Sequence, residues 1–155
     1  MTIPRFYVPG PWTSDRITFP EKASHHAMRV LRMRNGDEAE VFDGEGRTAR
    51  GRTEFSSEGT VLIAESYPEH GRESPLFITL AQAFVSPDKM EWITEKAVEA
   101  GASRIVFFPA ARSVTKLSGD KLTKRLEKLR ATAVSACEQC GRSRIPEIET
   151  FASAE

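Results

Sequence analysis

The stretch LFITLAQAFVSPDKMEWITEKAVEAGASRIVFFP, residues 76–109, decides the fold of the second half of the chain. It opens with an apolar run, residues 76–83, of the kind expected for a strand buried on both faces of a parallel sheet. Ser86 and Pro87 then provide the N-cap and the first position of a helix, and residues 104–109 are a second strand of the same type. A strand, a helix and a strand with short connections predict a βαβ unit.

A long helix is predicted from Ser118 to Gly141, where a residue that tolerates positive φ is wanted just past the helix end. Four cationic side chains crowd its early polar face: Lys121, Lys124, Arg125 and Lys128. We interpret this cluster as a solvated helix face.

A carboxylate, an amide and two guanidinium groups gather at the end of this helix: Glu138, Gln139, Arg142 and Arg144. Such a set is able to hold an anionic or base-like ligand. It also has an ordinary explanation, because basic side chains near a helix C-terminus are favoured by the macrodipole, and Glu138 with Arg142 is an i, i+4 pair. From the residues alone, both interpretations stay open.

The first 70 residues predict a small barrel. Strand patterns occur at residues 3–8, 38–43, 47–55 and 59–66, and one short helix at residues 21–31. About five short strands with a single helix are typical of small barrels. Residues 67–75 are polar and contain two prolines and a glycine, which is typical of a domain boundary. We therefore expect two domains, residues 1–70 and 74–155.

The composition is that of a soluble globular protein, with 39% hydrophobic and 28% charged residues and a formal net charge of zero. There is no apolar run of about 18 residues and no charged leader, so we expect a cytoplasmic protein without a membrane partner. Bulk charge does not indicate a nucleic-acid partner. Arginines cluster locally, however, at positions 29, 32 and 34 and at positions 47, 50 and 52.

Cys137 and Cys140 form a single C-x-x-C pair. A zinc site needs four ligands, and the three histidines lie far away in the sequence, so no metal site is predicted. A thiol redox pair remains an alternative, although such pairs usually open a helix rather than close one. We interpret the two cysteines as small buried apolar side chains.

Ten sequence blocks occur in a specific order along the chain. They are Pro4-Arg5-Phe6-Tyr7, His26-x-x-Arg29-Val-Leu-Arg32, Gly36-Asp37, Phe42-Asp43-Gly44, Lys89-Met-Glu91, Lys96-Ala-x-Glu99-x-Gly101, Pro109, Arg112-Ser113, Glu138-Gln-Cys-Gly-Arg142 and Ile145-Pro146. In order and spacing they resemble the bacterial RsmE family, methyltransferases that act on N3 of a uridine in small-subunit (16S) ribosomal RNA. The resemblance covers essentially the whole chain.

The resemblance implies a two-domain protein of mixed α+β and α/β class. An N-terminal PUA-like β-barrel would bind RNA, and an incomplete SPOUT-type α/β methyltransferase domain would follow it. S-adenosylmethionine is the implied cofactor, 16S rRNA or the small ribosomal subunit the implied partner, and a homodimer the implied assembly. In the family a C-terminal trefoil knot with a Gly-Pro-Glu-Gly-Gly-like loop makes the cofactor pocket. That loop does not occur here, so we expect the chain to be a fragment.

The resemblance also nominates site residues. Methylation of N3 requires loss of the imide proton, and the negative charge that develops on the two carbonyl oxygens is stabilised by preorganised cations. Arg112 and Arg142 are the candidate cations, and Glu138 is a candidate for positioning the base or accepting a proton. The candidate RNA contacts are Arg5, His26, Arg29, Arg32 and Lys89.

Alternatives to these roles remain. Arg29 and Arg32 also suit the end of the short helix, and Lys96 with Glu99 is an ordinary surface pair. For the whole chain, the alternative function is a non-catalytic RNA-binding module that dimerises through its α/β part.

Overall fold

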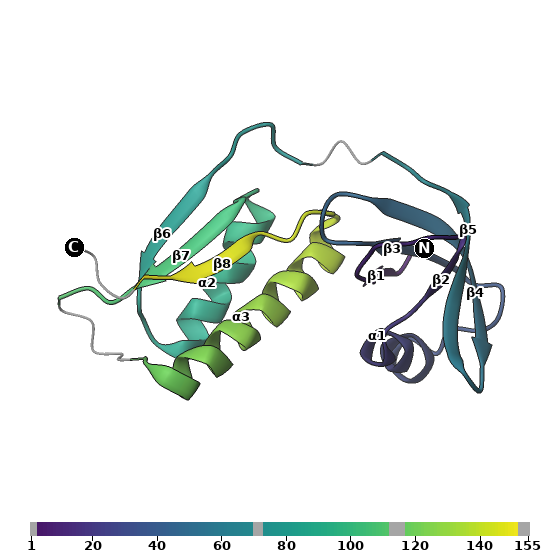
Figure 1. Ribbon diagram of the computed structural model, residues 1–155, viewed down its shortest axis with the longest axis horizontal. Helices are drawn as coiled ribbons and strands as arrows, with labels where there is room; N and C mark the ends of the chain where they lie inside the picture. The colour runs from purple at the N-terminus through teal and green to yellow at the C-terminus, as the bar shows by residue number, and fades with distance from the viewer. Residues whose placement is uncertain (1–2, 70–72, 112–116, 152–155) are drawn as a thin grey trace. The chain divides into compact units, whose positions relative to one another are not determined.

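The computed structural model of the chain describes residues 3–69, 73–111 and 117–151. The chain divides into a first unit, Met1–Gly71, and a second unit, Arg72–Glu155 (Figure 1). Each unit has its own sheet and its own helices, and each is described by itself below. Among the described residues, no helix is both long enough and apolar enough to span a lipid bilayer.

The first unit is built on one five-stranded sheet in the order β1-β3-β4-β5-β2. Its strands are β1 (Arg5–Tyr7), β2 (Arg16–Thr18), β3 (Glu38–Phe42), β4 (Thr48–Ser56) and β5 (Gly59–Ser66). Among the described strand pairs of this sheet, β1–β3 alone is parallel. Among the described strands, β1 and β2 end the sheet without pairing with each other, so the closed barrel predicted from the sequence is not observed. The sequence pattern also missed β2, which has only three residues.

A close approach of β4 to β5 requires a glycine at position 51. The register between β4 and β5 shifts between Arg50 and Gly51, which marks a bulge. A Cβ at position 51 would lie 1.8 Å from the carbonyl oxygen of Ile63. Only glycine lets the two backbones approach this closely.

The predicted short helix consists of two pieces, α1 (Glu21–His25) and a π-helical segment, η1 (His26–Val30). Ala27 is fully buried, and the hydroxyl oxygens of Ser24 and Thr60 lie 2.5 Å apart. These contacts attach the helix to the core of the first unit. Buried apolar side chains of that core include Phe6, Ile17, Phe19, Val41 and Leu62.

The second unit confirms the predicted βαβ pattern. Three parallel strands, β6 (Thr79–Ala83), β7 (Arg104–Phe108) and β8 (Glu147–Thr150), lie in sequence order. The helix α2 (Pro87–Glu99) connects the first two strands, and α3 (Gly119–Cys140) lies between the second and third. Gly141 adopts φ 86° at the end of α3, as predicted.

Within the described part of the second unit, helices pack against one face of this sheet. Right-handed crossovers between strands in sequence order place α2 and α3 on the same face, where Ile105, Phe107 and Ile148 are buried. The prediction that residues 76–83 are buried on both faces is therefore wrong. Leu76 and Phe77, which precede β6, are 65% and 73% exposed. Within β6, Thr79 and Ala81 are exposed as well, because β6 is an edge strand and no described element covers its second face.

Candidate functional site

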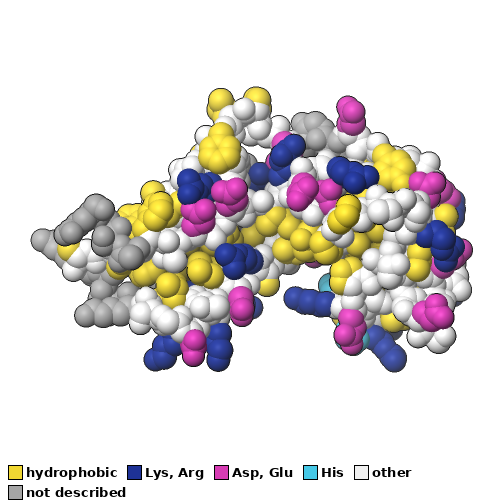
Figure 2. All heavy atoms as spheres, in the orientation of Figure 1, with side chains coloured by type: hydrophobic (Ala, Val, Ile, Leu, Met, Phe, Trp, Pro, Cys, Tyr) yellow, Lys and Arg dark blue, Asp and Glu magenta, His cyan; other side chains and the backbone are white. Residues whose placement is uncertain are grey.

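The first unit presents an exposed arginine segment after α1. Arg29 lies in η1, and Arg32 and Arg34 follow it; all three are exposed. Arg32 has φ 53°, a left-handed conformation that is uncommon for a residue with a side chain and tends to occur at functional sites. In Figure 2, basic side chains, an acidic one and histidine atoms are visible near the position of α1. The sequence-predicted residues Arg29 and Arg32 are therefore brought together on the surface.

Three apolar side chains share this segment and are also exposed: Met28, Val30 and Leu31. His26 is exposed as well, and its ring meets the buried Phe6 ring edge-on, with centroids 6.1 Å apart. We call Arg29, Arg32 and Arg34, together with these apolar neighbours, the arginine surface. Cations beside exposed apolar groups suit a partner that carries both phosphates and unpaired bases.

Arg5 lies in a different environment. Its Nε is 2.6 Å from Oε1 of Glu40, and its guanidinium stands 4.9 Å from the centre of the Phe42 ring. Arg50 pairs with the other oxygen of Glu40 at 3.1 Å. The Arg5 side chain is 12% exposed and that of Glu40 3%. This is a buried ion pair inside the sheet, and the RNA-binding role of Arg5 stays a prediction.

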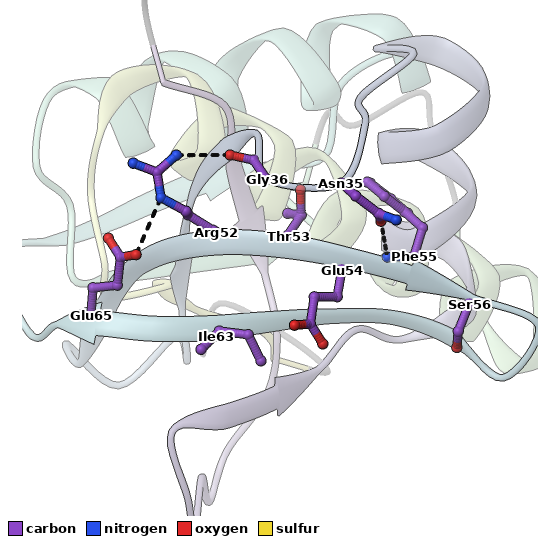
Figure 3. Close-up of a pocket in the computed structure, with 9 residues that line it drawn as sticks. All are labelled: Asn35, Gly36, Arg52, Thr53, Glu54, Phe55, Ser56, Ile63 and Glu65. Carbon is purple, nitrogen blue, oxygen red and sulfur yellow. Dashed lines mark hydrogen bonds and ion pairs between the residues drawn. The ribbon is translucent and has the colours of Figure 1, made fainter.

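The first unit also has a depression of about 650 Å³ on the surface of β4 and β5 (Figure 3). Arg52 lies at one side, 3.3 Å from Oε1 of Glu65, and it donates a hydrogen bond to the carbonyl oxygen of Gly36 at 3.0 Å. Glu54, at the other side, pairs with Arg16 at 3.1 Å. Each charge at this depression has an opposite charge beside it, so we assign no ligand to it.

In the second unit the guanidinium of Arg142 is enclosed. Its Nη1 donates to the carbonyl oxygens of Val98 at 3.1 Å and Ala102 at 2.8 Å. Its Nε and Nη2 lie 3.0 and 2.9 Å from Oε2 of Glu73. The Arg142 side chain is only 7% exposed. Arg142 thus ties the end of α3 to the end of α2 and to the start of the second unit.

Glu73 also accepts hydrogen bonds from the backbone. Its Oε1 accepts backbone N–H groups from Ser143 at 2.8 Å and Arg144 at 2.9 Å. Burial raises the pKa of Glu73, but the hydrogen bonds from Arg144, Ser143 and Arg142 outweigh burial, so the pKa lies below its ordinary value. Sequence reasoning missed Glu73, because it stands in the polar segment taken as a domain boundary and its partner is 69 positions away.

The two catalytic candidates at the end of α3 lie at the amino end of the sheet. Helix α3 runs antiparallel to the strands, so Glu138 and Arg142 are near the residues where β7 and β8 begin. Glu138 is half-buried in the last turn of α3. Open α/β sheets bind ligands at the opposite end, where the strands finish. The two ends of a five-residue strand are about 13 Å apart.

Lys89 belongs to that opposite, carboxyl end. It is exposed in the first turn of α2, which begins shortly after β6 finishes. Arg112 lies outside the described residues; the described chain stops at Ala111, three positions after β7 ends. Within one chain, the structure thus brings Glu138 and Arg142 together but places Lys89 at the other end of the sheet.

The two cysteines are not joined in a disulfide; Cys137 is buried and Cys140 half-buried. The Cys137 thiol donates to the carbonyl oxygen of Arg144 at 3.6 Å. Within the described residues, no group of three or more side chains suited to hold a metal ion is found.

Comparison with known proteins places both units. A family model described as an RNA methyltransferase domain matches residues 72–155, and one described as an RNA methyltransferase PUA domain matches residues 19–64. Ribosomal RNA small subunit methyltransferase E of Bacillus subtilis is 34% identical over 126 residues, and that of Mycobacterium tuberculosis is 35% identical over 128. Each match covers 80% of this chain but only 49% and 47% of the relatives. The chain spans about half the length of these proteins.

Solved structures agree. A putative methyltransferase from Legionella pneumophila, in complex with bound SAM, superposes with a TM-score of 0.89 at 30% identity, covering 97% of this chain and 63% of that chain. The ribosomal RNA small subunit methyltransferase E from Neisseria gonorrhoeae, bound to S-adenosyl methionine, gives 0.85 at 30% identity, with 96% and 63% covered. The fold is that of a methyltransferase with a PUA domain. Since the first family model matches more than half of the chain, the chain belongs to the RNA methyltransferase family that includes ribosomal RNA small subunit methyltransferase E.

Proposed function

We propose that this chain is part of an S-adenosylmethionine-dependent enzyme that methylates N3 of a uridine in 16S ribosomal RNA in the cytoplasm. The observation that carries the proposal is the likeness of 97% of the chain to a methyltransferase solved with bound SAM. The two relatives named above, both ribosomal RNA small subunit methyltransferase E, support the choice of RNA. The position of the methylated atom follows from the sequence resemblance.

In this proposal the first unit, as a PUA-like barrel, holds the RNA through the arginine surface. Its guanidinium groups contact phosphates, and Met28, Val30 and Leu31 pack against exposed bases or sugars. His26 lies at the edge of the same surface and contributes a further polar contact. The exposed positions of these side chains support this role.

The chemical step needs charge stabilisation more than it needs a strong base. Loss of the N3 proton places negative charge on the two flanking carbonyl oxygens, and a fixed cation beside them lowers the barrier. Arg112 is our proposed cation, and Lys89 is proposed to contact the RNA. Glu138 lies at the other end of the sheet within one chain, so its role in positioning the base stays a prediction. Four N–H contacts of Arg142 are already used inside the unit. Arg142 is therefore proposed as a positioning residue, and a direct catalytic contact stays a prediction that requires displacement of Glu73.

The described residues at the carboxyl end of the sheet do not fit S-adenosylmethionine by themselves. Phe84, directly after β6, is buried. Phe108 is the last residue of β7, and Pro109 follows it. The cofactor carries adenine, ribose and amino-acid groups, which need placed donors and acceptors. No cofactor contact is assigned to these residues.

The exposed arginine surface also suits a second candidate, a non-catalytic RNA-binding module that dimerises through the second unit. Methyl transfer separates the two candidates. Radiolabelled S-adenosylmethionine and small-subunit rRNA are incubated with this chain and with the longest polypeptide that contains it in its source cells. We expect N3-methyluridine from the longer polypeptide. RNA binding without methyl transfer by either version would refute the enzyme and leave the module.

The arginine surface has its own test. Replacing two phosphate contacts, as in Arg29→Gln/Arg32→Gln, should reduce the slope of log binding constant against log salt by about 1.4 to 1.8. The matched control is Arg16→Gln/Arg52→Gln, because both of these arginines already pair with carboxylates in the same unit. Equal slopes in the two variants would show that the arginine surface does not bind RNA.

Light scattering of the chain measures whether it forms a dimer.

A further inference from the structure

The first half of α3 carries four cationic side chains on one face. They are Lys121, Lys124, Arg125 and Lys128, at positions i, i+3, i+4 and i+7, which lie above one another on a helix. The row spans about 10 Å at 1.5 Å per residue. Figure 2 shows basic side chains at the end of the second unit where α3 begins in Figure 1. We call these four residues the α3 ridge.

Only part of this charge is neutralised. Glu91 of α2 lies 2.9 Å from Nη1 of Arg125 and 3.7 Å from Nζ of Lys128, so one carboxylate serves two cations. Lys121 and Lys124 are exposed, and no ion pair to either is found within the described residues. The net charge of the ridge with Glu91 is therefore strongly positive.

The arrangement opposes the stability of the helix itself. Lys121 with Arg125, and Lys124 with Lys128, are like-charge pairs at i, i+4, which destabilise helices. Lys121 also lies in the first turn, where the helix dipole disfavours cations. Two acids flank the row at such spacings, Asp120 four positions before Lys124 and Glu127 three positions after it, but no ion pair joins either acid to Lys124 within the described residues. The two like-charge pairs within the ridge therefore remain unfavourable for the helix.

The place of the ridge in the fold adds a second argument. Helices α2 and α3 both begin at the carboxyl end of the sheet, because each runs antiparallel to the strands. That end is where open α/β sheets hold their ligands. A cationic row beside the carboxyl end of the sheet is therefore placed to contact a polyanion that binds there.

We propose that the α3 ridge is a second RNA-binding surface, carried by the methyltransferase unit itself, which holds phosphates of the substrate RNA. The proposal rests on the proposed function, since RNA is the polyanion on which this family acts. It is separate from the arginine surface, which belongs to the first unit. The ridge contributes affinity and register but reads no base, because lysines contact phosphates as point charges.

The test uses the whole chain and a small-subunit rRNA fragment, with binding measured by fluorescence anisotropy over a range of salt concentrations. Lys121→Gln/Lys124→Gln should reduce the salt slope by about 1.4 to 1.8 and weaken binding about tenfold at low salt. The matched control, Lys96→Gln/Arg130→Gln, removes the same charge from α2 and from the second half of α3. Thermal unfolding of the ridge variant should be unchanged or shifted upward, because like-charge repulsion is relieved.

Each outcome decides the proposal. If the ridge variant has the same salt slope of RNA binding as the control, the ridge proposal is overturned. If Arg29→Gln/Arg32→Gln still lowers that slope, the proposed function stands without the ridge. A ridge variant that binds rRNA like the parent but no longer sediments with the small ribosomal subunit also overturns the ridge proposal, in favour of an acidic ribosomal protein. A parent chain that fails to bind RNA refutes the ridge and the arginine surface together.

Discussion

Removing the Glu73 carboxylate should destabilise the second unit far more than an exposed position would. The carboxylate accepts from the backbone of Ser143 and Arg144 and from two nitrogens of Arg142, at 2.8 to 3.0 Å. In Glu73→Ala these donors lose their acceptor. Arg142, whose side chain is 7% exposed, becomes a buried cation without a counter-ion.

The expected loss in free energy of unfolding follows from the burial of the Glu73 and Arg142 side chains. Removing one partner of a buried ion pair costs about 3–5 kcal/mol. The Glu73 side chain is 20% exposed, so water replaces part of the lost solvation, and Arg142 keeps its bonds to two carbonyl oxygens. We expect Glu73→Ala to lower the free energy of unfolding by about 2–4 kcal/mol. Glu73→Gln keeps an acceptor oxygen and should cost about 1–2 kcal/mol.

The same contacts predict a pH dependence. The pKa of Glu73 is held below its ordinary value of 4.5, because its hydrogen bonds outweigh the effect of burial. A carboxyl group with a lowered folded-state pKa stabilises the protein above its unfolded-state pKa and loses that contribution as pH falls through the folded-state value. The stability difference between the parent and Glu73→Gln should therefore be constant above about pH 5 and shrink below pH 4.5.

Hydrogen exchange measured by mass spectrometry suits this test, because two units need not unfold in one transition. Peptides from α3 and β8 should lose protection in Glu73→Ala, whereas peptides from β4 and β5 should not. The control is Glu95→Ala, whose carboxylate pairs with Lys96 on the surface at 2.8 Å, because an exposed ion pair contributes little to stability. Equal losses of protection in α3 for the two variants would refute the reasoning.

Three further outcomes are expected. Gly51→Ala should lower the free energy of unfolding of the first unit by about 3 kcal/mol in urea titrations, because its Cβ would meet the carbonyl oxygen of Ile63 at 1.8 Å; an unchanged midpoint would contradict this. Glu40→Gln should cost about 3 kcal/mol by the same assay, since the buried carboxylate serves two arginines. Replacing Cys137 and Cys140 with serine should leave RNA binding unchanged, and loss of binding in a folded variant would favour a redox role.

Local patterns were sufficient for most helices and strands. The apolar run, the Ser86-Pro87 start and the glycines predicted the βαβ unit, and Gly141 predicted where α3 ends. These signals act over a few residues, because a cap or a positive φ is set by neighbouring backbone atoms. The arginines at positions 29, 32 and 34 were also recognisable as a local cluster in the sequence, whereas the exposure of their apolar neighbours Met28, Val30 and Leu31 was not.

Local patterns were thus enough for the βαβ unit, for α3 and for the family resemblance, but not for the three-residue strand β2 or the open sheet of the first unit. Which charges remain available to a ligand depends on how distant parts of the chain pack together. Arg5 and Arg142 looked like binding residues, yet each is enclosed by a carboxylate, Glu40 at 35 positions and Glu73 at 69 positions along the chain. The α3 ridge looked like an ordinary solvated face until its single shared carboxylate, Glu91, was located on the neighbouring helix. Pairing of charges depends on long-range packing, which no local pattern specifies.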